Sequence, residues 1–155
     1  MAQTLPKVAN VELNNEVAVE INTTPAAEAA TYADMTKAFK TIAVAINETV
    51  YNAFYLSDKG FGSSSVTGAA PAITVTGDFM KNDPVCAYLD SIQWEIGAKR
   101  VTDIKFTRNG QTVTSNVTLT SIAIAGGDSQ APNAVTIVMT FNGKPAVAEA
   151  TDETV

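Results

Sequence analysis

The chain has 155 residues and a mass of 16.2 kDa, the usual size of one domain and large enough to bury a hydrophobic core. Sixteen Asp and Glu against ten Lys and Arg give a net charge of −6, so the chain lacks the basic surface with which proteins grip nucleic-acid phosphates. It has no histidine, which excludes Ser-His-Asp and Cys-His catalytic sites and histidine-containing metal sites.

Targeting signals are not evident. The N-terminus has neither a basic start nor the apolar run of a signal peptide. The longest apolar stretches are far shorter than the roughly 20 residues that span a bilayer. We therefore expect a soluble chain with no membrane partner.

Alternating apolar and polar residues predict strands through most of the chain. In the first half we predict a strand over 36–46, a turn at 46–49 and an aromatic-rich strand over 50–56, which together make a hairpin. A further strand is predicted at about 72–79, where Gly77 marks a bulge or a close backbone approach.

One α-helix is predicted at about 83–96. Asp83 suits the N-cap and Pro84 the first helical position, while Gly97 suits the C-terminal left-handed position. Helical spacing gives an apolar stripe that must lie on a sheet, made of Val85, Tyr88, Leu89, Ile92 and Ile96. Cys86 and Trp94 flank this stripe, and Cys86 is expected to be a core thiol and not a nucleophile.

The second half contains the strongest pairing signal. Apolar alternation on either side of Asn109-Gly110, a favoured two-residue turn, predicts a hairpin of 101–106 with 113–119. The apolar phase slips at 121–122, which predicts a β-bulge, and a last strand is expected at 135–142.

Three segments lack clean periodicity: an N-terminal arm (1–15), a Gly/Ser-rich loop (57–71) and an acidic C-terminal tail (146–155). Phe61 and Val66 amid small residues suggest that the loop orders against a partner. The fold class predicted is mainly β: a single domain over 1–155 in which two packed sheets form a β-sandwich or barrel with one flanking α-helix, the long loop and the extended arm.

Catalytic motifs are weak. Gly60-x-Gly62 is not followed by a Lys-Ser/Thr pair or a helix, so a phosphate-binding loop is not expected. Asp78 and Asp83 are candidates for paired carboxylates, but a solvated acidic corner explains them better. We predict no enzyme activity, no cofactor and no metal.

The order of motifs resembles the tail tube (major tail) proteins of long-tailed bacteriophages over about residues 30–146. The motifs are Lys59-Gly60-Phe61-Gly62, Val75-Thr76-Gly77-Asp78, Asn82-Asp83-Pro84-Val85, Asn109-Gly110, Ala125-Gly126-Gly127-Asp128 and Phe141-Asn142-Gly143-Lys144-Pro145. The resemblance implies a structural virion protein that forms hexameric rings, joined into a continuous inner barrel and stacked into a tube that conducts DNA. It also implies a location in the virion tail after assembly in the host cytoplasm. The implied partners are other copies of the chain and the tail terminator, tape measure and baseplate or tail-tip proteins.

Two surfaces follow from this resemblance. Contacts between subunits or rings are expected at Leu5, Val8, Val11, Phe61, Gly62, Val66, Lys99 and Arg100. A polar stripe on one predicted strand is equally compatible with a wet lumen and with ordinary solvent exposure; it consists of Thr112, Thr114, Asn116, Thr118 and Thr120. Because each copy carries −6, a ring of copies would repel a passing phosphate backbone.

Three alternatives remain open. The tube could belong to a phage-tail-like bacteriocin or a contractile injection device. The Thr-rich strands also suit a β-sandwich decoration or adhesin module that binds a separate partner. A carboxylate-based glycoside hydrolase would depend on Asp78 and Asp83.

Overall fold

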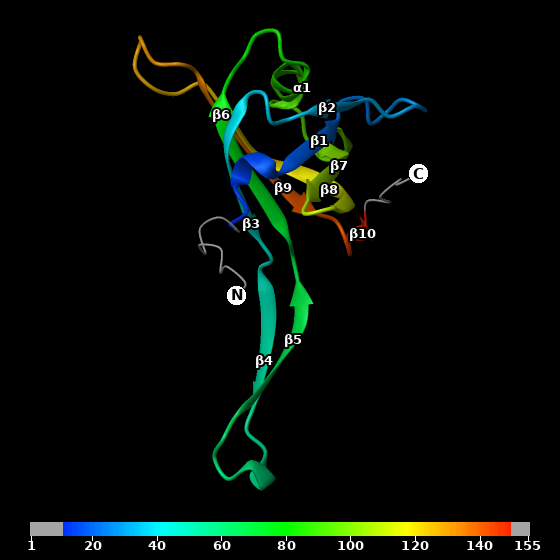
Figure 1. Cartoon of the computed structure of the whole chain (residues 1–155), viewed down its shortest axis with the longest axis vertical. Coiled ribbons are helices and arrows are strands. Elements are labelled where there is room, and N and C mark those ends of the chain that lie inside the picture. Colours follow the sequence, from blue (N-terminus) through cyan, green and yellow to red (C-terminus); the bar gives the residue numbers. More distant parts are fainter. Residues whose placement is uncertain (1–10, 150–155) are drawn as a thin grey trace, which may run out of the picture.

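The computed structural model describes residues 11–149 of the chain. A compact body carries a long two-stranded hairpin that projects from one end, and the α-helix lies at the opposite end of the body (Figure 1). In chain order the elements are η2 (Asn14–Glu16), β1 (Ala18–Asn22), β2 (Tyr32–Asp34), β3 (Phe39–Ala45), β4 (Glu48–Ala53), η3 (Leu56–Asp58), β5 (Ser63–Ala69), β6 (Ala72–Asp78), α1 (Pro84–Ile92), η4 (Gly97–Arg100), β7 (Val101–Arg108), β8 (Gln111–Ile124), β9 (Ala134–Phe141) and β10 (Ala146–Glu149).

The larger sheet is antiparallel throughout. Its order is β2-β1-β7-β8-β9-β6-β3, and β10 pairs with the beginning of β8. The smaller sheet is the β4–β5 ribbon. The mainly β fold with two sheets and one flanking α-helix is therefore confirmed.

The core lies inside the larger sheet, which curls until β1 faces β6 across a shared apolar cluster. Alternate residues of the central strands point into this cluster, as period-two patterning requires. The helix adds Val85, Leu89 and Ile92 to it. Fully buried members from the strands include Ile21, Ile73, Ile104, Leu119, Ile137 and Met139.

The β7–β8 hairpin and its neighbouring bulge are both confirmed. Arg108 pairs with Gln111 across Asn109 and Gly110, whose φ angles of 49° and 77° define a type I′ turn. Further along β8 the register with β9 shifts between Thr120 and Ala123, and Ser121 has a φ of 52°. The bulge turns β8 so that its second half can follow β9.

The predicted hairpin of 36–46 with 50–56 is wrong. β3 pairs with β6, and β4 pairs with β5, so the chain runs on from β3 into β4 instead of reversing. Asn47, with a φ of 55°, produces a kink between the two strands where a turn was expected. Local alternation identified both strands but could not identify the partner of either, because each partner comes later in the chain.

The Gly/Ser-rich segment 57–71 is also different from the expected loop. Residues 63–69 form β5, in which Val66 pairs with Val50 and Ser65 with Tyr51. The reversal is limited to residues 54–62. Ser and Gly rank low as strand formers, and pairing with β4 overrides that preference.

The helix ends earlier than predicted. It stops at Ile92, so Trp94 and Ile96 lie beyond it and are each 87% exposed, and the expected place of Ile96 on the buried stripe is wrong. Asp83 occupies the N-cap position but makes no side-chain capping bond.

The Cys86 side chain is fully buried, and burial raises the pKa of its thiol. Cys86 is therefore confirmed as a core thiol.

Gly77 marks a close approach of two strands. A Cβ at this position would lie 2.1 Å from the carbonyl oxygen of Ala38, opposite the point where the β3–β6 register shifts near Phe39.

We expect Gly77→Ala to lower the free energy of unfolding by about 2–3 kcal/mol, because backbone must move to admit the methyl group. Chemical denaturation measures this. Gly126→Ala is the control, since a Cβ there meets nothing within 4 Å; equal stability of the two variants would contradict the close approach.

Candidate assembly surfaces

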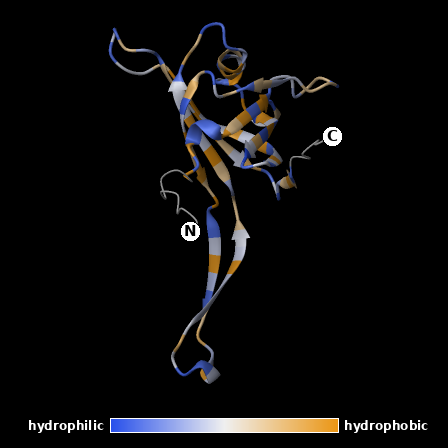
Figure 2. Ribbon diagram, in the orientation of Figure 1, coloured by the Kyte–Doolittle hydropathy of each residue, from blue (hydrophilic) through white to orange (hydrophobic). Residues whose placement is uncertain are grey.

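The projecting hairpin presents apolar side chains to solvent along its whole length. Val50 and Val66 form a cross-strand pair and are 48% and 57% exposed. Apolar and polar residues alternate along the ribbon (Figure 2). An isolated two-stranded ribbon is marginally stable in water, and exposed apolar patches mark interaction sites. The hairpin is therefore a candidate contact surface.

The hairpin tip, residues 54–62, concentrates this exposure. Phe54, Tyr55, Leu56 and Phe61 are 73%, 58%, 97% and 79% exposed. The short η3 helix and left-handed Lys59 shape the turn. An ideal Cβ on Gly62 would lie 2.8 Å from the Phe54 ring, so glycine admits this ring against the tip backbone.

The hairpin carries three of the residues that were predicted as interface residues, namely Phe61, Gly62 and Val66. Phe54, Tyr55 and Leu56 were missed because they were assigned to a strand paired with residues 36–46.

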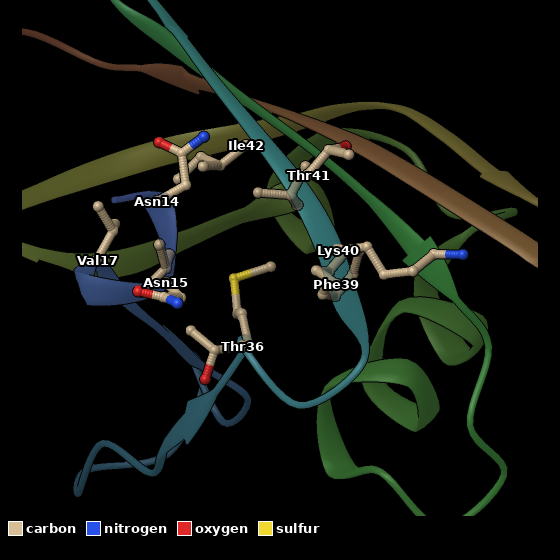
Figure 3. A pocket seen from close by; sticks show the side chains of 11 residues that line it. Asn14, Asn15, Val17, Thr36, Phe39, Lys40, Thr41 and Ile42 are labelled. Atoms are coloured by element: carbon tan, nitrogen blue, oxygen red, sulfur yellow. The ribbon is translucent and has the colours of Figure 1, made fainter. Parts of the chain in front are cut away.

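An apolar groove lies on the body beside β3, and Val75 of β6 contributes to its lining. We call it the β3 groove. Its cavity is about 340 Å³ and is bounded by the η2–β1 segment on one side and β3 on the other (Figure 3). The apolar lining residues are Val17, Val19, Met35, Phe39, Ile42 and Val75, and the polar ones are Asn14, Asn15, Thr36, Lys40 and Thr41. A second hollow of about 200 Å³ shares Asn14, Val17 and Ile42 with it.

Within residues 11–149, β3 and the second half of β8 in the larger sheet have backbone N–H and C=O groups with no neighbouring strand on one side. β3 pairs only with β6, and the second half of β8 pairs only with β9. Free edges invite pairing with other chains unless something protects them. The free edges of β3 and of the second half of β8 are therefore candidate sites for pairing with another chain.

Of the three N-terminal residues predicted to contact other subunits, only Val11 lies within the described part of the chain. Val11 is 58% exposed and lies next to Glu12, whose carboxylate accepts a hydrogen bond from Arg108 at 2.9 Å. Leu5 and Val8 lie outside the described residues. Of the predicted tail 146–155, the first four residues form β10.

Lys99 and Arg100 contact their own chain. The Lys99 ammonium lies 3.5 Å from the Glu95 carboxylate. The Arg100 guanidinium donates hydrogen bonds to the backbone carbonyl oxygens of Gln93, Glu95 and Leu119 at 2.6, 2.9 and 3.2 Å. Arg100 therefore fixes the segment after α1, and an interface role for either residue stays a prediction.

The predicted polar stripe lies on one face of β8 and continues onto its neighbours. Asn116 donates to Asp103 on β7 at 3.1 Å, and Asn142 donates to Asn116 and Thr118 at 2.9 Å each. Thr112, Thr114, Thr118 and Thr120 are half-buried, and Asn116 is exposed. We call this surface the polar face. Hydroxyl and amide groups dominate its centre, and Lys105 lies over the Tyr32 ring at 4.0 Å.

Features of a catalytic site are weak in the described part of the chain. No group of three or more His, Cys, Asp or Glu there could hold a metal. Asp78 pairs with Lys40 at 3.1 Å, while Asp83 is buried at the start of α1. Thr36 hydrogen bonds lower the pKa of Asp34, which holds a tight turn. Among residues 11–149, no helix is long and apolar enough to cross a membrane.

Comparisons with known proteins give similarity of structure without detectable similarity of sequence. No protein-family model matches the sequence, and a search of curated proteins finds no match. Solved structures contain similar chains, among them the following three. One chain belongs to the tail of an empty gene transfer agent (GTA) particle refined with helical and C6 symmetry; it is 12% identical with a TM-score of 0.70, over 89% of this chain and 99% of the other.

The other two chains belong to contractile injection systems. One lies in the extended sheath-tube complex of an extracellular contractile injection system, PVC (12% identity, TM-score 0.52, covering 94% and 99%). Another lies in the baseplate of the anti-feeding prophage, AFP (7% identity, TM-score 0.56, covering 96% and 99%). The chain therefore has the fold of subunits of phage-like tails, over nearly the full length of each of these neighbours.

Proposed function

We propose that the chain is a structural, non-enzymatic subunit that assembles with copies of itself into stacked hexameric rings, forming a tail tube through which DNA passes. The single observation that carries the proposal is the projecting hairpin, whose exposed apolar residues need a partner surface. The shared fold with chains of tails and injection systems, one of them with C6 symmetry, supports it.

The charge of the chain suits this role. A wall that conducts DNA must not bind it, and binding requires cations that neutralise phosphates. Each copy contributes a net charge of −6. The polar face offers hydroxyl and amide groups at its centre, so we propose that it lines the tube.

The tail of a long-tailed phage is the setting we propose, with assembly in the host cytoplasm. The partners there are the tail terminator, tape measure and baseplate or tail-tip proteins. A bacteriocin or contractile injection device is the second candidate, because two of the structural neighbours come from contractile injection systems.

Self-association separates these tubes from a decoration or adhesin module. We expect the purified chain to sediment as rings or longer polymers as its concentration rises, because each heterologous contact creates a site for the next copy. Analytical ultracentrifugation over a hundredfold concentration range measures this. A species that stays monomeric or trimeric throughout would instead support the decoration module.

A further inference from the structure

We propose that the hairpin tip of one copy inserts into the β3 groove of a copy in the next ring. This proposal rests on the proposed function, and it specifies which two surfaces hold successive rings together. Figure 1 shows the tip at the far end of the hairpin from the body, so it cannot reach the groove of its own chain. The contact joins two different surfaces and therefore propagates instead of closing a pair.

The two surfaces match in polarity. The tip exposes Phe54, Tyr55, Leu56 and Phe61. The floor of the groove is built from aliphatic and aromatic side chains, and its volume of about 340 Å³ falls within the range of cavities that bind small apolar groups. Filling it with tip side chains would remove apolar surface from water on both copies, which is the main driving force of association.

The two surfaces are also matched in charge. Two copies at −6 repel each other, so they approach with least penalty where both surfaces are nearly neutral. The tip carries Asp58 and Lys59, which cancel. Among the residues lining the groove, Lys40 carries the one charge, and it is paired with Asp78 at 3.1 Å. Neither surface leaves an uncompensated charge in the contact.

The length of the hairpin fixes the offset between the two copies. The chain runs from Ile42 in the groove to Leu56 at the tip through fourteen residues of nearly continuous strand. At about 3.3 Å per residue this is at most about 46 Å, and the kink at Asn47 shortens it. The proposal therefore predicts an axial repeat of at most about 46 Å between rings.

Cysteine cross-linking tests the contact directly. The one native cysteine, Cys86, is fully buried and gives little background. Under mild oxidation, the double variant Leu56→Cys/Asn15→Cys should give a ladder of covalent multimers on a non-reducing gel. Leu56→Cys/Asn133→Cys is the matched control, because Asn133 is equally exposed but lies outside the groove. Equal ladders from both variants would overturn the proposal.

Blocking variants give an independent test. Leu56→Asp at the tip and Asn15→Trp at the groove rim should each reduce the mass of pelleted tubes by more than about tenfold. The controls Ser129→Asp and Asn133→Trp, both at exposed positions outside the tip and the groove, should pellet like the original chain. Because each blocked chain keeps one intact surface, mixing the two blocked chains should yield ring pairs and no tubes.

The outcomes separate this contact from the proposed function. If the original chain forms no tubes, the proposed function fails. If it forms tubes and Leu56→Asp forms them equally well, the tube stands and the tip-groove contact is wrong. Unchanged circular dichroism of both blocked chains shows that they remain folded, as expected for exposed positions.

Discussion

Replacing residues 48–69 with a single glycine is expected to leave a folded chain that no longer polymerises. None of the removed residues belongs to the hydrophobic core. The flanking strands are already adjacent, since the backbone N–H of Ala70 donates to the carbonyl oxygens of Ile46 and Asn47 at 3.1 and 3.3 Å. Loss of the exposed apolar ribbon should therefore abolish pelletable polymer while the melting temperature changes by only a few degrees.

Phe61→Ser is the milder form of this experiment. It removes one exposed ring from the tip and is expected to raise the concentration needed for polymerisation without altering the fold. Electron microscopy and calorimetry on the same samples separate assembly from stability. Normal tubes from the deletion variant would contradict the role of the hairpin.

A lysine on the polar face is expected to make the tube bind DNA. Thr120→Lys places one cation per subunit on this face, and the long side chain can extend along the surface. If the face lines the tube, each phosphate contact should steepen the dependence of log K on log salt by about 0.9. Fluorescence anisotropy with a short labelled DNA at several salt concentrations measures this.

Ser129→Lys is the control for Thr120→Lys, because it adds the same charge in the exposed loop between β8 and β9 and not on the polar face. It should leave DNA binding weak. Equal DNA binding by both variants would show that net charge matters and that the polar face has no special position.

Local chemistry predicted the features that depend on neighbouring residues. Asn109-Gly110 specified its own turn type, the phase slip at Ser121 located the bulge, and Gly77 fits a position where any Cβ would meet backbone. The helix start followed from Asp83-Pro84 for the same reason.

Features that depend on distant residues were not predictable. The partner of β4 is β5, whose Ser and Gly residues gave no strand pattern, so the Gly-rich reversal at the tip was taken as part of a longer loop. Arg100 donates to the carbonyl oxygens of Gln93 and Glu95 just after α1, and its third bond, to Leu119 of β8, forms only when β8 is in place. The β3 groove joins η2, β1, β3 and β6, so it exists only in the folded sheet.

Cryo-electron microscopy of the concentrated, purified chain tests the central claim most directly. The account predicts hollow tubes of stacked rings, with a repeat of at most about 46 Å and the hairpins crossing between rings. Isolated particles whose hairpins pack against their own bodies would contradict it.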